Sequence, residues 1–184
     1  MAANGPFENQ LADIFVNKAP KLPQGGKAAL VKYLPWISLI VGLLTLYTAW
    51  VLWHWAHTVN ALVNYANTLS QAFGGTNVAS NRLSVGIWLG IIVLFVEGLF
   101  YLTAFPGLKS HSKSGWYMLY YGALLNIVYG VVVVFTSYGG IGNLIGSLIG
   151  SAIGFWLLFQ IRDVYKGAAV PKAPVAPSAP TKTV

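Results

Sequence analysis

GGIGNLIGSLIGSAIGFWLLFQIRD, residues 139–163, is the segment from which the rest of the chain can be interpreted. Glycine recurs in it at every fourth position, at Gly142, Gly146, Gly150 and Gly154. Residues four apart lie on nearly the same face of an α-helix, so these glycines form a face without side chains. No charged residue occurs from residue 139 to residue 160. A segment of this length and composition predicts a membrane-spanning helix.

The glycine face predicts close packing between helices. Lipid tails are as apolar as leucine, so membrane helices associate through close backbone contact rather than through the hydrophobic effect. We expect this face to pack against another helix of the same chain. The alternative is self-association across the same face. For the chain as a whole, the possible partners are further copies of itself or other membrane protein subunits.

The composition indicates a membrane protein with several spans. The chain has 184 residues, of which 56% are hydrophobic and only 8% are charged, whereas a soluble domain has about 25% charged residues. The formal net charge is +7, but the basic residues flank apolar runs, so we expect contact with the lipid bilayer and no nucleic-acid partner. The absence of cysteine excludes disulfides and thiolate chemistry. The first thirty residues lack an apolar run, so we expect no cleavable signal peptide.

Four apolar runs predict an all-α fold with four transmembrane helices. The predicted spans cover about residues 34–56, 83–105, 116–137 and 140–161, within a membrane domain of residues 34–165. Small residues at helical spacing also occur in the second and third spans, and they include Gly86, Gly90, Gly122 and Gly130. A lipid-facing helix does not need such residues, so we expect a tight four-helix bundle.

The segments outside the spans differ in character. Residues 1–33 contain a short amphipathic helix at 6–17, which lies at the cytoplasmic interface or docks on a partner, and then a basic linker over 18–33. Residues 59–73 extend the first span as an amphipathic helix, which projects outward or bends into the outer interface. Residues 166–184 are rich in proline and alanine and predict a disordered cytoplasmic tail.

Basic residues near the ends of the spans indicate the orientation of the chain. Lysines precede the first span, and basic residues also lie between the second and third spans and after the fourth. The connection between the first and second spans has only Arg82, and the turn after the third span has none. We therefore expect both termini in the cytoplasm. The layout is similar to that of many small four-span proteins of the bacterial inner (plasma) membrane, and we expect the same location.

Glu97 is the only ionisable side chain well inside a predicted span. A charge at that depth is costly, so such a residue is a candidate for function. Asn126 lies at a similar depth in the third span, and no intramembrane lysine or arginine is present to pair with Glu97. We expect a protonated carboxyl group that hydrogen-bonds to Asn126 or to a hydroxyl group and holds helices together. The alternative is a site for proton or cation coupling.

His54 and His57 form an H-x-x-H pair near the outer end of the first span. Two imidazoles at this spacing could share a metal ion, but a zinc site needs three or four ligands and no third ligand lies nearby in the sequence. We therefore interpret the pair as interfacial residues among tryptophans and only as weak metal candidates. We predict no metal site and no cofactor.

The motif content argues against an enzyme. No phosphate-binding glycine loop and no G-x-S-x-G, H-E-x-x-H or C-x-x-C motif occurs. The leading hypothesis is a structural or accessory membrane protein, which packs through its glycine faces and presents cytoplasmic segments to partners. The first alternative is a small translocator or channel component that uses Glu97. A weaker alternative is a membrane enzyme that acts on lipid or quinone through tyrosines of the third span.

Overall fold

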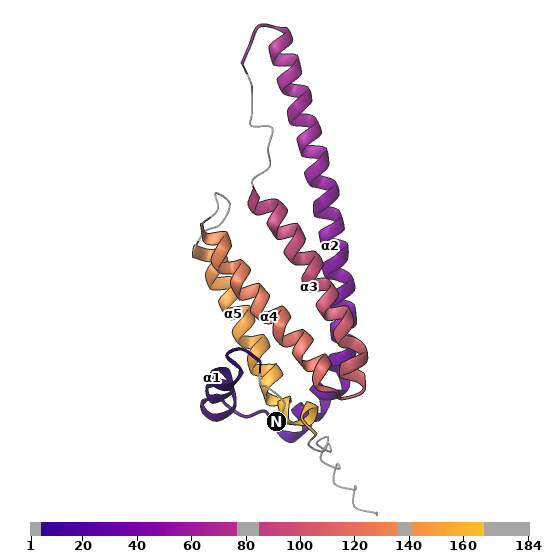
Figure 1. Cartoon of the computed structure of the whole chain (residues 1–184), viewed down its shortest axis with the longest axis vertical. Helices are drawn as coiled ribbons and strands as arrows, with labels where there is room; N and C mark the ends of the chain where they lie inside the picture. The colour runs from indigo at the N-terminus through magenta and orange to yellow at the C-terminus, as the bar shows by residue number, and fades with distance from the viewer. Residues whose placement is uncertain (1–4, 77–84, 136–140, 168–184) are drawn as a thin grey trace, which may run out of the picture.

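The computed structural model describes residues 5–76, 85–135 and 141–167, and these residues form helices and connections without strands (Figure 1). In chain order the elements are α1 (Glu8–Ala12), the π-helix η1 (Asp13–Lys18), α2 (Gln24–Ala72), α3 (Val85–Lys109), α4 (Lys113–Val134), α5 (Ile141–Gln160) and α6 (Arg162–Tyr165). The all-helical class that the sequence predicts is confirmed.

Three of the described helices, α2, α3 and α4, are long and apolar enough to cross a membrane. The chain is therefore a membrane protein by length and composition. The fourth apolar helix, α5, contains the glycine face. By the same criterion of length and hydropathy its apolar part covers only residues 144–160, which is shorter than the other three. The proline-rich tail predicted for residues 166–184 lies almost wholly outside the described residues.

Two predicted helix boundaries are wrong. The second half of the predicted linker is helical, because α2 begins at Gln24 and runs without interruption through Pro35. Likewise, α3 passes through Pro106 and ends at Lys109, although the sequence predicted its end at residue 105. Proline interrupts the helical hydrogen-bond ladder, but burial of Val31 and Leu108 favours the helical conformation around both prolines.

The four long helices form a row and not a closed four-helix bundle. Helix α2 packs against α3, α3 against α4, and α4 against α5, so α5 stands at one edge of the row (Figure 1). We call the end that holds α1, α6 and the beginning of α2 the proximal end, and the opposite end the distal end. Toward the distal end, the α4–α5 pair diverges from the α2–α3 pair (Figure 1).

The hydrophobic core lies at the proximal end and is rich in aromatic rings. Trp116 is only 1% exposed, and its indole Nε1–H donates a hydrogen bond to the Leu158 carbonyl at 2.9 Å. Its ring stacks on Tyr120 at 5.2 Å and meets the edge of Phe159 at 5.4 Å. Tight shape complementarity of this kind fixes the relative positions of α4 and α5 at this end.

Helices α3 and α4 approach closely at Gly107 and Gly115, beside this core. A Cβ atom on Gly115 would overlap backbone atoms of Gly107 and Leu108. Only glycine allows two helices to come this close. The contact lies next to the connection between the two helices, from which their distal parts diverge.

Helix α2 extends well past the other helices. Its 49 residues form a rod of about 74 Å at about 1.5 Å per residue. The last aromatic contact between α2 and α3 joins His57 and Trp88, with ring centroids 5.5 Å apart. Beyond this contact α2 continues straight and projects past the start of α3 (Figure 1). Residues 59–72 therefore continue the first predicted span as one uninterrupted helix.

Candidate functional site

The structure brings together the two intramembrane polar residues that the sequence singles out. The carboxyl group of Glu97 is on α3, and the Asn126 side chain on α4 hydrogen-bonds to it. The Tyr101 hydroxyl, one turn further along α3, donates to Glu97 Oε1 at 2.9 Å. Glu97 is 7% exposed, so this cluster links two helices through hydrogen bonds in an apolar setting. Interhelical hydrogen bonds of this type stabilise membrane helix pairs by about 1 kcal/mol.

A polar cavity of about 460 Å³ adjoins this cluster between α4 and α5. Its lining residues are Asn126, Tyr129, Gly130, Val133, Gly146 and Ser147. The lining therefore offers an amide, a phenol and a hydroxyl group, and two glycines leave the space open. A polar cavity of this size can hold water or a small polar solute. Asn126 is the one residue that both lines the cavity and bonds to Glu97.

Four of the glycines predicted to pack helices together are buried, namely Gly86, Gly90, Gly122 and Gly130. A Cβ atom on Gly90 would lie 2.5 Å from the Tyr129 hydroxyl, and one on Gly130 would overlap the Ser147 side chain. These two glycines therefore allow α4 to approach α3 on one side and α5 on the other.

The glycine face of α5 behaves differently from the prediction. Gly142, Gly146, Gly150 and Gly154 are all exposed, and a Cβ atom on any of them would meet no atom within 4 Å. The expectation that this face packs against another helix of the same chain is therefore wrong. The reason is that α5 buries its aromatic face instead, with Phe155 and Phe159 each 2% exposed. Burying large aromatic rings contributes more than burying glycine, so the glycine face is left open.

The proximal end contains a polar cluster that sequence reasoning missed. The Glu8 side chain is fully buried, and its Oε1 accepts hydrogen bonds from Arg162 Nε at 2.8 Å and Lys166 Nζ at 2.5 Å. Its Oε2 accepts from the Tyr117 hydroxyl at 2.9 Å and from the Gly5 amide at 2.8 Å. Burial would raise the pKa of Glu8, but these hydrogen bonds outweigh it and lower the pKa to about 2. The carboxylate therefore stays ionised at neutral pH.

The cluster fixes the N-terminal segment, residues 5–22, to the proximal end of the chain. Gln160 extends the attachment, because its Nε2 donates to the Phe15 carbonyl at 3.0 Å and its Oε1 accepts from the Leu22 amide at 3.1 Å. The predicted amphipathic helix thus docks on its own chain. No local pattern could indicate this, because Glu8 and its cationic partners are more than 150 residues apart in the sequence.

His54 and His57 both contact tryptophan rings, His54 in a stacked arrangement and His57 in a tilted one. The ring centroids of Trp50 and His54 are 6.4 Å apart, and those of Trp53 and His57 are 4.8 Å apart. Within the described part of the chain, no group of three or more His, Cys, Asp or Glu residues could hold a metal ion. The arrangement fits aromatic residues at a membrane interface.

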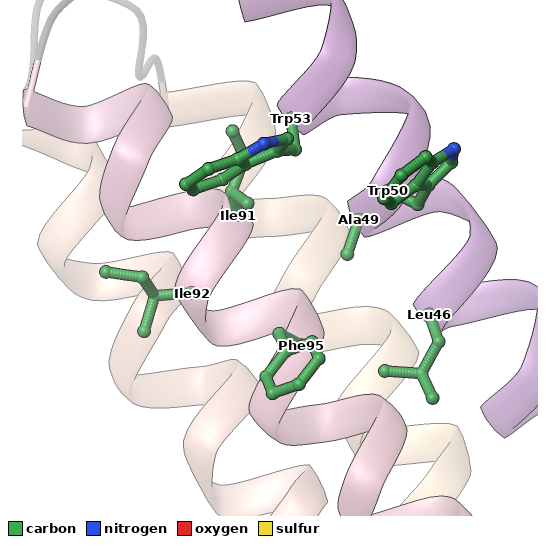
Figure 2. Close-up of a pocket in the computed structure, with 7 residues that line it drawn as sticks. All are labelled: Leu46, Ala49, Trp50, Trp53, Ile91, Ile92 and Phe95. Atoms are coloured by element: carbon green, nitrogen blue, oxygen red, sulfur yellow. The ribbon is translucent and has the colours of Figure 1, made fainter.

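An apolar groove of about 460 Å³ lies between α2 and α3, next to these tryptophans (Figure 2). Figure 2 shows the residues that line it: Leu46, Ala49, Trp50 and Trp53 on α2, and Ile91, Ile92 and Phe95 on α3. The lining has no ionisable group, so it offers no acid, base or nucleophile. Its surface suits hydrocarbon chains of surrounding lipid.

No protein-family model, no curated protein and no solved structure matches this chain. The class of protein is defined by the fold: an all-helical membrane protein with three helices able to cross a bilayer. The described residues add two polar clusters to this class, one around Glu97 inside the row of helices and one around Glu8 at the proximal end.

Proposed function

We propose that the chain is a non-enzymatic structural or accessory subunit with four transmembrane helices in the bacterial inner membrane. In this proposal the glycine face of α5 binds a transmembrane helix of another subunit or of a second copy. The observation that carries the proposal is that all four glycines of this face are exposed, and a Cβ atom on any of them would meet no atom within 4 Å.

The surroundings of the glycine face support binding of a helix. Ile145, Ile149 and Ile153, each next to a glycine of the face, are 51–57% exposed. A glycine groove beside a ridge of branched side chains allows a second helix to approach closely and to fit between the ridges. Lipid chains gain little from a groove of this kind, because they are flexible and lose conformational freedom on ordering.

The placement of charge supports the proposed topology. Every lysine and arginine of the described residues lies at the proximal end: in the N-terminal segment, at the beginning of α2, near the α3–α4 connection, or in α6 and the residue after it. Basic residues favour the cytoplasmic side, so we assign the proximal end and both termini to the cytoplasm. The 20 residues of α5 span about 30 Å, which matches the hydrocarbon thickness of a bilayer.

Gly150→Leu tests the proposed interface. The substitution fills the centre of the glycine face, and Ala152→Leu is a matched control, because Ala152 is also exposed on α5 but lies about 200° away around the helix. Blue native electrophoresis and crosslinking in native membranes should show a larger assembly for the natural chain and for Ala152→Leu. The same assembly should be reduced at least tenfold in Gly150→Leu.

An unchanged assembly in Gly150→Leu would rule out binding through this face. Gly150→Leu replaces a poor helix former with leucine, whereas Ala152→Leu replaces a slightly better one, so a loss of assembly confined to Gly150→Leu cannot be assigned to a weakened helix. The monomeric protein in detergent should remain folded in both variants, because residues 150 and 152 are both exposed and a Cβ atom at residue 150 meets no atom within 4 Å.

A second candidate function is transport, with Glu97 as a proton or cation site. The polar cavity next to Asn126 favours it, because intramembrane ionisable groups beside hydrated cavities mark ion pathways. Proteoliposomes with the natural chain should then show proton or cation flux that Glu97→Gln abolishes. Absence of flux for the natural chain would end this candidate and leave the accessory function untouched.

A further inference from the structure

The part of α2 that projects from the distal end carries a heptad pattern. Apolar residues occupy every a and d position over three heptads, namely Leu52, Trp55, Val59, Leu62, Ala66, Leu69 and Phe73. The f positions, which are outermost in a coiled coil, are the exposed amides Asn64 and Gln71, and the b positions are Asn60 and the buried Asn67. An apolar a/d row with polar residues at the outermost positions is typical of a two-stranded coiled coil.

Among the described residues, the part of this apolar row beyond Val59 is exposed. Leu62 is 63% exposed, Leu69 48% and Phe73 84%. The side of α2 that faces α3 is a different one, marked by the buried Ala49 and Ala56. Its centre lies about 100° around the helix from the a/d row. We call the exposed row formed by Val59, Leu62, Ala66, Leu69 and Phe73 the distal seam.

The distal seam lies beyond the tryptophans that mark the membrane interface. The seam begins at Val59, four residues after Trp55, and it continues for about 21 Å along the helix to Phe73. Residues 58–76 contain no charged side chain. A single helix of this composition is poorly stable in water, because it exposes leucine and phenylalanine and lacks stabilising charge pairs.

We propose that the distal seam pairs with the distal seam of a second copy as a parallel two-stranded coiled coil. Two copies in the same membrane have the same orientation, so their α2 helices project in the same direction and to the same height. Leucine at the d positions and Val59 at an a position favour two strands. The flanking e and g positions carry no charge that would repel an identical helix, and they are Thr58, Val63, Tyr65, Ser70 and Ala72.

The area that the distal seam can bury is small for a soluble dimer but sufficient for a dimer held in one membrane. A phenylalanine such as Phe73 buries about 150–250 Å² when it is covered, so the whole seam offers a few hundred Å² per copy. A stable interface between soluble proteins buries about 800 Å² per partner. A smaller interface suffices for two copies in one membrane, because the membrane raises their effective concentration and fixes their relative orientation.

Single-cysteine crosslinking tests the pairing in native membranes, because the natural chain contains no cysteine. Leu62→Cys and Leu69→Cys place a thiol at d positions, where two parallel helices meet. Asn64→Cys, at the outermost f position, is the matched control. Under mild oxidation the two d variants should give a band at twice the mass of the chain, at least tenfold stronger than the control.

A charge in the seam should abolish the crosslink if the seam forms it. In the Leu62→Cys background, Leu69→Glu should remove the dimer band, whereas Thr68→Glu, on the exposed surface outside the seam, should retain it. Gly150→Leu should also retain it, because the glycine face of α5 is at the other edge of the row. The proposal is overturned by equal crosslinking at residues 62 and 64, by a product of another mass, or by loss of the band in Gly150→Leu.

Discussion

The proximal and distal ends of the molecule are built in different ways. At the proximal end, rings from α4, α5 and η1 contact one another, and Phe15, Tyr120, Phe155 and Phe159 are all part of or packed against the core. At the distal end the helices diverge, and the side chains that remain exposed include Phe135 at 86% and Phe73 at 84%. The aromatic rings of the proximal end are therefore buried within a single chain, whereas large apolar side chains of the distal end remain exposed.

Glycine has opposite roles in the α3–α4 contact and on the outer face of α5. At the proximal end, Gly115 lies against the backbone of Gly107 and Leu108, so its missing side chain is a requirement of packing. On α5, a Cβ atom on Gly150 would meet no atom within 4 Å, so its missing side chain is not required by packing inside this chain. The same residue type therefore indicates internal packing in one place and an external partner in the other.

Replacing a core tryptophan should have the largest effect on stability. Trp116→Ala removes a fully buried ring and the hydrogen bond to Leu158, and such truncations cost about 3–5 kcal/mol. Trp50→Ala is the matched distal variant, because Trp50 is 65% exposed, and we expect about 0.5 kcal/mol or less. Denaturation of both variants in the same detergent measures the difference. Equal losses would contradict the assignment of the core to the proximal end.

Alanine substitution should lower the stability of the fold at a packed glycine and raise it at an open one. Gly115→Ala forces a methyl group against backbone atoms, and overpacking of this kind costs about 1–3 kcal/mol. Gly150→Ala meets no atom of the chain, so the detergent-solubilised monomer should gain about 1 kcal/mol from better helix propensity. Thermal unfolding in detergent compares the two. A loss of stability in Gly150→Ala would mean that the α5 glycines pack inside the chain after all.

The Glu8 cluster should make the proximal end sensitive to acid. The pKa of Glu8 is lowered from 4.5 to about 2 in the folded chain, so its contribution is present above pH 4.5 and is lost as the pH falls toward 2. Glu8→Gln cannot titrate, and its stability should fall less steeply over that range than that of the natural chain. Asp13→Asn is the control, since the exposed Asp13–Lys18 pair should contribute little. Parallel curves for Glu8→Gln and the natural chain would show that Glu8 does not stabilise the fold.

Patterns within one helix could be predicted from the sequence. Apolar runs, basic flanks and the 3-4 spacing of residues 59–73 each depend on neighbours a few positions apart, so the membrane class, the three long helices and the amphipathic extension of the first span follow from them. The helix boundaries that the sequence predicts near Pro35 and Pro106 are wrong, because a proline is a local signal, whereas the packing of Val31 and Leu108 depends on distant residues.

Contacts between distant segments had to be seen in the tertiary structure. Glu8 reads as a solvated residue of an amphipathic segment, yet it is buried by Arg162 and Lys166, more than 150 residues away. The α5 glycines predict a packed face, yet the aromatic residues on the other side of the same helix take the internal contact. The periodicity of a sequence defines which residues share a face of a helix. Which face is buried depends on competition among all faces for the available neighbours, and that competition is settled only when the chain folds.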